Sequence, residues 1–349
     1  MSDQDRPYGT PRGRATMKDV AARAGVGLST VSRVVSGKGG VSKEKARAVE
    51  RAIRELDFSR NDFAHTLRTG SAGAIGMVVT NIGDPFFSAL IDAVEERART
   101  RDQMVLVASA TDDSDEAVRV IQRLIRRRLD GLIVVAPEGA DLSFLRREEA
   151  AGTPVVYVDQ PPAGFSGDIV LVDNEGGMAA AVRHLHAVGH ERIACLAHAS
   201  GAFTSERRQE GYARGLHDVG LRLDPALVVA IEDEVAAAVE VLREMSALPE
   251  PPTAFVTTNS RTTKVVLQAL RLLSLSPAIV GFDDLDLATL LTPPLTTIAQ
   301  DPAASGHAAA DLLFERIDGL GGPYRRIVLS TRLVERGSGE LPPHPTWSG

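Results

Sequence analysis

TMKDVAARAGVGLSTVSRVVSGKGGVSKEKARAVERAIRELDF, residues 16–58, is the stretch that decides how this chain is built. Its apolar residues recur at helical spacing and predict three short helices, over Met17–Ala24, from about Leu28 to Ser36, and over Lys43–Asp57. Gly25 follows the first helix, where a C-cap glycine commonly ends one. Three short helices, the first two joined by a four-residue turn that starts at Gly25, are typical of a helix-turn-helix.

The second of these helices has one apolar and one polar face. Its valines are expected to point inward, whereas the outward face carries Leu28, Ser29, Ser32 and Arg33. Arg33 offers two parallel hydrogen bonds to a guanine edge in the major groove. Thr16, Ser32, Lys43 and Arg47 are candidate phosphate contacts, which position a protein without reading the base sequence. An ordinary three-helix cap with a solvated basic face is the alternative.

Charge is distributed unevenly along the chain. Residues 1–70 carry 14 Lys and Arg against 8 Asp and Glu, a net charge of +6, although the whole chain has a net charge of −7. The other residues therefore carry −13. A basic head before an acidic body predicts a small polyanion-binding module joined to a separate domain.

From Gly73 onward, short apolar runs alternate with amphipathic segments. The runs cover residues 74–79, 104–109, 131–136, 154–159, 168–173, 192–197, 253–258 and 278–283. Apolar strands joined by helical crossovers predict parallel sheets covered on both faces. Eight such strands fit two similar α/β lobes better than one, with a boundary near Val172–Asp173 and later crossings near Asp283–Asp301 and Pro323–Leu329.

These patterns divide the chain into five segments. Residues 1–15 are rich in Gly, Pro and charge and are predicted to be disordered. The headpiece covers residues 16–58, and a polar connector with a short helical patch covers 59–72. Residues 73–336 form the two-lobed body, and residues 337–349 a flexible tail.

Polar residues follow several of the predicted strands, at the ends where α/β proteins bind ligands. They are Asp159, Asp173, Asn259 and Asp283. Carboxylates and an amide suit sugar hydroxyls, which both donate and accept hydrogen bonds. The alternative for Asp173 is a structural role at the start of a helix.

The headpiece string closely resembles the headpiece of the lactose-repressor (LacI/GalR) family, and the resemblance extends over about residues 16–336. Its further motifs are IGMVVTNIGDPFF (75–87), DGLIVV (130–135), VDNEGG (172–177), HLHAVGHERIACLA (184–197), ERRQEGY (206–212), VGFDD (280–284) and TPPLTTIAQD (292–301). The resemblance implies an all-α helix-turn-helix headpiece before an α/β body of two parallel-sheet lobes, like that of periplasmic binding proteins. It further implies a sequence-specific transcription regulator, and a repressor is the expected type.

The resemblance implies a homodimer whose two headpieces read a near-palindromic DNA operator. It also implies that the connector forms a hinge helix on specific DNA, where Leu67 wedges between base steps in the minor groove. Asn61 and Ala64 match other hinge positions. Because residues 337–349 contain no heptads, a dimer is expected rather than a coiled-coil tetramer.

A small-molecule effector between the lobes, a sugar or sugar derivative, also follows from the resemblance. Arg208 matches a position that contacts the effector in the family. Phe86 lies in a segment that resembles the family's first cleft loop, where an aromatic ring can stack on a sugar, with core packing as the alternative for Phe87. Effector binding would change the spacing of the two hinges, with a coupling free energy of about 1–3 kcal/mol. The sequence is compatible with an effector that releases the protein from DNA and equally with one that promotes DNA binding.

The chain departs from the family pattern in four places. Gly27 stands where Ser or Thr usually caps the recognition helix, which predicts a modest weakening. Arg60 replaces the usual Pro before the hinge, so folding of the hinge on DNA is expected to cost more entropy. Ser260 follows Asn259 where the family has Asp, and the segment before Val280 is short, which weakens any inference of ligand class.

Other classes of protein are less well supported. The sequence has no GxSxG, GxxxxGK[ST] or HExxH motif and no Cys/His metal cluster, so no enzyme, cofactor or metal is expected. A sugar-binding protein of a transport or sensing system is the alternative, opposed by the basic head and the missing export signal. No apolar run approaches the ~20 residues of a membrane span, so a cytoplasmic protein without membrane contact is predicted.

Overall fold

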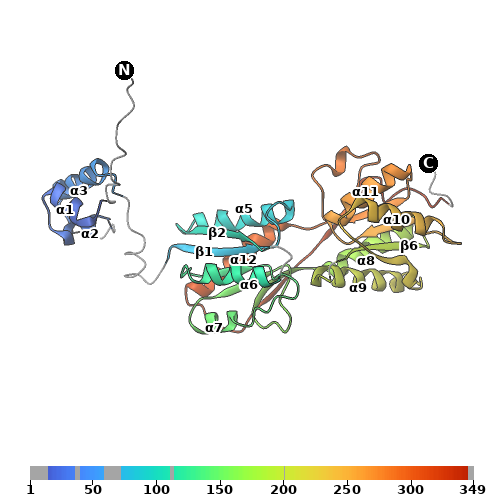
Figure 1. Cartoon of the computed structure of the whole chain (residues 1–349), viewed down its shortest axis with the longest axis horizontal. Helices are drawn as coiled ribbons and strands as arrows, with labels where there is room; N and C mark the ends of the chain where they lie inside the picture. Colours follow the sequence, from blue (N-terminus) through green and yellow to red (C-terminus); the bar gives the residue numbers. More distant parts are fainter. Residues whose placement is uncertain (1–14, 36–39, 59–71, 111–113, 200, 345–349) are drawn as a thin grey trace, which may run out of the picture. The chain divides into compact units, whose positions relative to one another are not determined.

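The chain divides into two compact units, residues 1–72 and 73–349 (Figure 1). The computed structural model describes residues 15–35, 40–58, 72–110, 114–199 and 201–344. The predicted disordered residues 1–14 and the three hinge residues Asn61, Ala64 and Leu67 lie outside this part of the chain.

The first unit contains the three helices that the headpiece sequence predicts. They are α1 (Met17–Ala24), α2 (Leu28–Val35) and α3 (Lys43–Glu55). Gly25 ends α1 in the left-handed conformation, at φ 65°, where its lack of a Cβ removes the steric cost. Val20, Val31 and Val49 are fully buried where the three helices meet, which leaves the polar face of α2 exposed.

The second unit begins with a lobe built on a six-stranded, wholly parallel sheet of order β11-β5-β4-β3-β1-β2. Its strands are β1 (Ala74–Val79), β2 (Met104–Ser109), β3 (Leu132–Val134), β4 (Val155–Val158), β5 (Asp168–Val172) and β11 (Arg326–Leu329). Its helices are α5 (Pro85–Arg99), α6 (Ser114–Ile125), α7 (Leu145–Ala150) and α12 (Pro302–Ile317).

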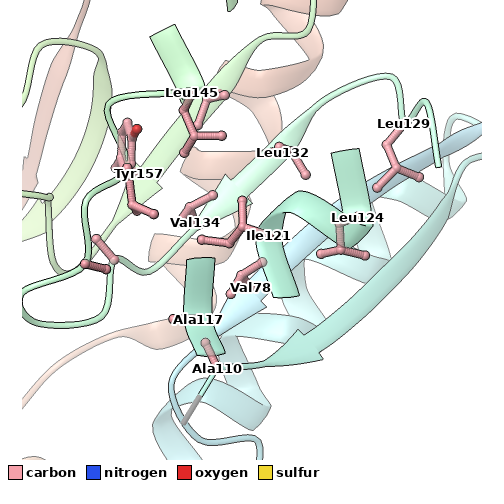
Figure 2. Close-up of a cluster of buried hydrophobic side chains, with 14 of the residues drawn as sticks. Val78, Ala110, Ala117, Ile121, Leu124, Leu129, Leu132, Val134, Leu145 and Tyr157 are labelled. Carbon is pink, nitrogen blue, oxygen red and sulfur yellow. The ribbon is translucent and has the colours of Figure 1, made fainter. Parts of the chain in front are cut away.

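Side chains alternate between the two faces of this sheet, so each face has its own core. Ala74 and Val78 of β1 pack on the side of α6 and α7, whereas Ile75 and Met77 pack on the side of α5 and α12. Figure 2 shows the first core, with Ile121 of α6 directed at the strand residues. Burial on both faces explains why the strands read as continuous apolar runs.

The second lobe repeats this plan with a six-stranded sheet of order β12-β10-β9-β8-β6-β7, in which only the β10–β12 pair is antiparallel. Its strands are β6 (Ile193–His198), β7 (Val228–Ile231), β8 (Ala254–Thr257), β9 (Ala278–Phe282), β10 (Thr296–Ala299) and β12 (Arg332–Val334). Its helices are α8 (Asn174–Val188), α9 (Phe203–Asp218), α10 (Val235–Ser246) and α11 (Ser260–Leu273), with 3-10 turns η1 (Pro225–Leu227) and η2 (Ala288–Leu290).

The chain passes between the lobes three times. The first two places agree with the sequence prediction, and the third lies just after the predicted Pro323–Leu329. It leaves the first sheet after β5, returns after β10 to form α12, and crosses back between β11 and β12 (Figure 1). The eight predicted strands are all present. Strands β10, β11 and β12 were not predicted, because they are only three or four residues long and partly polar. Strand β7 was not predicted either, although its four residues are all apolar.

The prediction of a flexible tail from residue 337 is wrong for its first residues. Ser338 is buried, its hydroxyl donates to the carbonyl of Ile279 (2.7 Å), and the amide of Thr296 donates to it (2.9 Å). Leu341 packs against the core of the second lobe. The segment is held because its backbone and side chains pair with polar groups of β9 and β10.

Candidate ligand cleft and DNA-binding surface

A cavity of about 180 Å³ opens at the carboxyl ends of strands from both sheets of the second unit. The first lobe contributes Asn81 after β1 and Asp159 after β4, and the second lobe contributes His198, Asn259 and Asp283 at the ends of β6, β8 and β9. The cavity therefore lies where the strand-end rule predicts a ligand, and its walls are rich in hydrogen-bonding groups.

Arg208 of α9 is the buried cation of this cavity, with a side-chain exposure of only 4%. Its Nε donates to Asn174 Oδ1 (2.7 Å), its Nη1 donates to the carbonyl of Thr258, and its guanidinium lies 3.7 Å from the centre of the Phe282 ring. Its Nη1 also lies 3.8 Å from Asp283 Oδ2. These contacts fix the guanidinium before any ligand arrives.

Asp283 holds several groups of the second lobe together. It follows β9 with a φ of 75°, a left-handed conformation that is costly for a residue with a Cβ. Its carboxylate accepts from the backbone N–H of Ser260 (3.0 Å) and from the side-chain amide of Gln300. Gln300 Oε1 is buried without a hydrogen-bond partner in the described part of the chain.

Asp159 is the corresponding acid of the first lobe, and it also adopts a left-handed conformation, with φ 64°. Burial raises the pKa of its carboxyl to about 6, because the charged form loses hydration, while Arg208 opposes the shift. No side chain among the described residues donates a hydrogen bond to this carboxylate. Asp159 is thus a desolvated acceptor in the cavity wall.

The loop before α5 adds an acid and two aromatic rings. Asp84 caps α5 by accepting from the backbone N–H of Phe86 (2.9 Å), and burial raises the pKa of its carboxyl. Phe86 and Phe87 both line the cavity and pack edge to face, with centroids 5.2 Å apart. Apolar ring surface therefore faces polar groups across the cavity.

Five of the six residues that the sequence proposes for the effector line this cavity, namely Phe86, Asp159, Arg208, Asn259 and Asp283. Asp173 does not: it is the N-cap of α8, and its carboxylate accepts from the amide of Gly176 (2.8 Å). The structural alternative for Asp173 is the observed one. Asn259 lines the cavity and also caps α11, by accepting from the amide of Thr262 (2.8 Å).

The sequence proposals omit several lining residues. Asn81, Asp84, His198, Arg261 and Gln300 all line the cavity. Gln300 follows β10 directly, so the strand-end rule would have found it had that short strand been predicted. Asn81 and His198 also follow predicted apolar runs, at residues 74–79 and 192–197, so the same rule covers them. Asp84 lies in the motif of residues 75–87, whereas Arg261 had no comparable signal in the sequence.

The headpiece presents its predicted DNA contacts on the surface. Leu28, Ser29 and Arg33 on α2 are exposed, with 47% of Leu28 accessible, and Ser32 is partly exposed. Lys43 and Arg47 are exposed on α3. Thr16 is exposed as well. Its hydroxyl forms a capping box with Asp19, so Thr16 also stabilises the start of α1.

Both units of the chain are similar to known proteins. Residues 16–61 match the family described as bacterial regulatory proteins, lacI family, and residues 182–339 match a periplasmic binding protein-like domain. The ribose operon repressor of Escherichia coli (strain K12) is 33% identical over 330 residues, covering 93% of this chain and 99% of the repressor.

Two solved structures extend the likeness to the fold. A lac repressor dimer bound to operator and the anti-inducer ONPF superposes with a TM-score of 0.82 at 26% identity, covering 93% of this chain and 99% of that one. A complex of the transcriptional regulator CelR with cellobiose gives a TM-score of 0.69 at 29% identity, covering 93% and 100%. With its helix-turn-helix headpiece, its two-lobed body and a repressor one-third identical over nearly its whole length, this chain belongs to the lacI family of bacterial regulatory proteins.

Proposed function

We propose that the chain is a transcriptional repressor that binds operator DNA as a dimer. Its affinity for that DNA falls or rises when a monosaccharide-sized ligand enters the cavity between its lobes. Membership of the family gives a DNA-binding regulator controlled by a small molecule. The ligand class and the residues that hold it are the proposed part. The relatives reported are transcription regulators, and no catalytic step is proposed.

The lining of the cavity is the observation that carries the ligand proposal. A volume of about 180 Å³ is small beside the ~300–1,000 Å³ of drug-sized pockets, which favours a compact ligand. Hydroxyl groups can donate to the carboxylate of Asp159 and to Oε1 of Gln300, neither of which accepts a side-chain hydrogen bond from a described residue, and they can accept from Arg208. Phe86 offers a ring surface on which the C–H face of a sugar packs.

The names of two relatives agree with this chemistry. One is a ribose operon repressor, and another was solved as a complex with cellobiose. The cavity volume favours a single sugar ring over a disaccharide, so a monosaccharide such as a pentose is the first ligand to test.

We propose that the dimer forms partly through the second lobe. Leu287, Leu290 and Leu291 lie exposed around η2, with 63%, 75% and 36% of their surface accessible. Such a group of exposed leucines is typical of a surface that a partner covers. A second copy of the chain is the expected partner, because the lac repressor with the same fold was solved as a dimer on its operator.

The direct experiment combines ligand binding with DNA binding. Full-length protein is titrated calorimetrically with a panel of pentoses, hexoses and their phosphates, and the operator is found by selecting random duplexes. The ligand that binds is expected to change operator affinity by about 5–150-fold, the usual range of allosteric coupling. An operator affinity that no bound ligand changes would remove the proposed regulation, whereas a panel without any binder would remove the ligand class.

A further inference from the structure

Three ionisable side chains gather on the second lobe, away from the ligand cavity. His184 lies on α8, whereas Glu335 and Glu340 belong to the segment after β12. The imidazole Nε2 lies 2.7 Å from Glu340 Oε1, and its Nδ1 lies 3.8 Å from Glu335 Oε1. His184 is largely buried, with 12% of its side chain exposed, while 65% of Glu335 is exposed. The cluster is therefore anchored at one end and open to solvent at the other.

The charges of this cluster favour a cation. A metal ion takes one nitrogen of an imidazole as its ligand, and Nε2 of His184 lies beside the carboxylate of Glu340. Two carboxylates near one imidazole attract a positive ion to the space between them.

One of the carboxylates is already held in place. The hydroxyl of Thr296 donates to Glu340 Oε2 at 2.7 Å, which leaves Oε1 directed at the histidine. A second hydrogen bond of this kind, to the oxygen that does not bind the metal, is typical of carboxylates that ligate metal ions.

We propose that His184, Glu335 and Glu340 bind one Zn²⁺ ion, with water completing the coordination. One ligand atom from each residue lies within 4.8 Å of the others, and they are the only such group among the described residues. An imidazole nitrogen with two carboxylate oxygens is a donor set that Zn²⁺ accepts, and binding requires the side chains to bring each ligand atom to the ~2.0–2.2 Å of a zinc bond. Sequence motifs did not reveal the site because His184 and the two glutamates are about 150 residues apart.

The bound ion would fasten the C-terminal segment to α8. Between the two glutamates lies Arg336, which forms hydrogen bonds of 2.7 Å to each carboxylate oxygen of Asp284, the neighbour of Asp283 in the cavity. The ion binds a folded arrangement that the unfolded chain lacks, so it stabilises the native state by mass action.

The test uses tag-free, full-length protein that has been stripped with EDTA and titrated with ZnCl₂ at pH 7.5. Calorimetry is expected to give one Zn²⁺ per chain, and saturation is expected to raise the melting temperature. His184→Gln and Glu335→Gln are each expected to weaken Zn²⁺ binding by about tenfold or more. Because Glu335 is mostly exposed, its variant keeps the fold and decides the matter if His184→Gln does not fold.

The matched control is His307→Gln, which removes another histidine–glutamate pair, His307 with Glu96 at 2.9 Å. Within the part of the chain that the structure describes, no third ligand is grouped with this pair. Its Zn²⁺ affinity should equal that of the wild type. The absence of stoichiometric binding, or wild-type affinity in Glu335→Gln, overturns the proposal and leaves the cluster held by its hydrogen bonds alone. Neither readout uses DNA or sugar, so the result is independent of the proposed function.

Discussion

At the scale of single residues, Asp159 combines features that favour ligand binding over stability. Its backbone is left-handed, its carboxyl pKa is raised to about 6, and no described side chain donates to it. A folded state that raises the pKa of a carboxyl binds its proton more tightly than the unfolded state does. The contribution of Asp159 to the free energy of unfolding therefore falls as the pH rises from about 4 to 6. Above pH 6 the buried, charged carboxylate destabilises the fold by its full amount.

Asp159→Asn is expected to remove the destabilisation by the buried charge and to weaken the contacts with the ligand. Asn tolerates the left-handed backbone and carries no charge, so the melting temperature of the ligand-free variant at pH 8 should equal or exceed that of the wild type. Ligand affinity should fall by about tenfold or more, since a charged acceptor is lost. Differential scanning calorimetry and titration calorimetry measure the two effects. A variant that is less stable at pH 8 and still binds ligand normally would contradict this interpretation.

The raised pKa also predicts how ligand affinity depends on pH. Hydroxyl donors favour the ionised carboxylate, so the affinity of the wild type should rise as the pH increases through 6 and level off above about 7. Asp159→Asn should lack this rise. Titrations at pH 5, 6, 7 and 8 test it, and equal wild-type affinities at pH 5 and pH 8 would exclude Asp159 as the acceptor.

On the headpiece, Arg33 and Lys43 are predicted to act differently although both are exposed cations. Arg33→Ala is expected to cost about 1–3 kcal/mol at one base pair and to relax the preference there. Lys43→Ala should weaken binding to all duplexes alike and flatten the salt dependence. Competition assays with operator variants separate the two patterns, and a uniform loss for Arg33→Ala would assign that residue to the phosphates.

The strand-end rule explains which site residues could be predicted from the sequence. Asp159 and Asp283 follow long apolar runs, so their positions at the cavity were predictable. The rule fails for Asp173 because it places a residue without fixing its side-chain direction, and the exposed amides at the start of α8 compete for that carboxylate. Gln300 was missed because β10 is short and polar, and its burial comes from neighbouring strands.

At the scale of secondary-structure elements, the contact between α8 and α9 depends on small residues. A Cβ added at Gly211 of α9 would lie 2.4 Å from the carbonyl oxygen of Glu175 on α8, so no larger residue fits without moving the backbone. The sequence shows a glycine there but gives no reason for it, because the close approach arises only when the two helices pack. α8 also carries Asn174, which orients Arg208.

Gly211→Ala is therefore expected to destabilise the body by about 1–3 kcal/mol, the usual cost of overpacking. Separation of α8 from α9 should also weaken ligand binding through Arg208. Gly321→Ala is the matched control, because a Cβ at Gly321 meets nothing within 4 Å. Chemical denaturation measures both variants, and a Gly211→Ala protein as stable as the control would mean that the helices adjust freely.

At the scale of the whole molecule, the two units have different roles. The basic headpiece carries the predicted DNA contacts, and the acidic body contains the ligand cavity. The headpiece has a core of only a few buried residues, and one headpiece covers too little DNA to be selective. Selectivity then requires two linked headpieces, because the second binds at a high effective concentration once the first is bound. The body supplies that link if two copies associate, which makes dimerisation a condition for operator binding rather than an added feature.

Leu290→Glu tests this dependence, because 75% of Leu290 is exposed and its replacement leaves the core of the lobe intact. A charge buried at the proposed interface should dissociate the dimer and lower operator affinity by about 100-fold or more, through loss of effective concentration. Ligand affinity should stay unchanged, since the cavity lies within one chain. Leu223→Glu, at a leucine 50% exposed elsewhere on the lobe, is the control that should remain dimeric. Sedimentation velocity, gel shift and calorimetry give the three readouts. A Leu290→Glu protein that stays dimeric places the interface on another surface, whereas a monomer with wild-type operator affinity refutes the need for two headpieces.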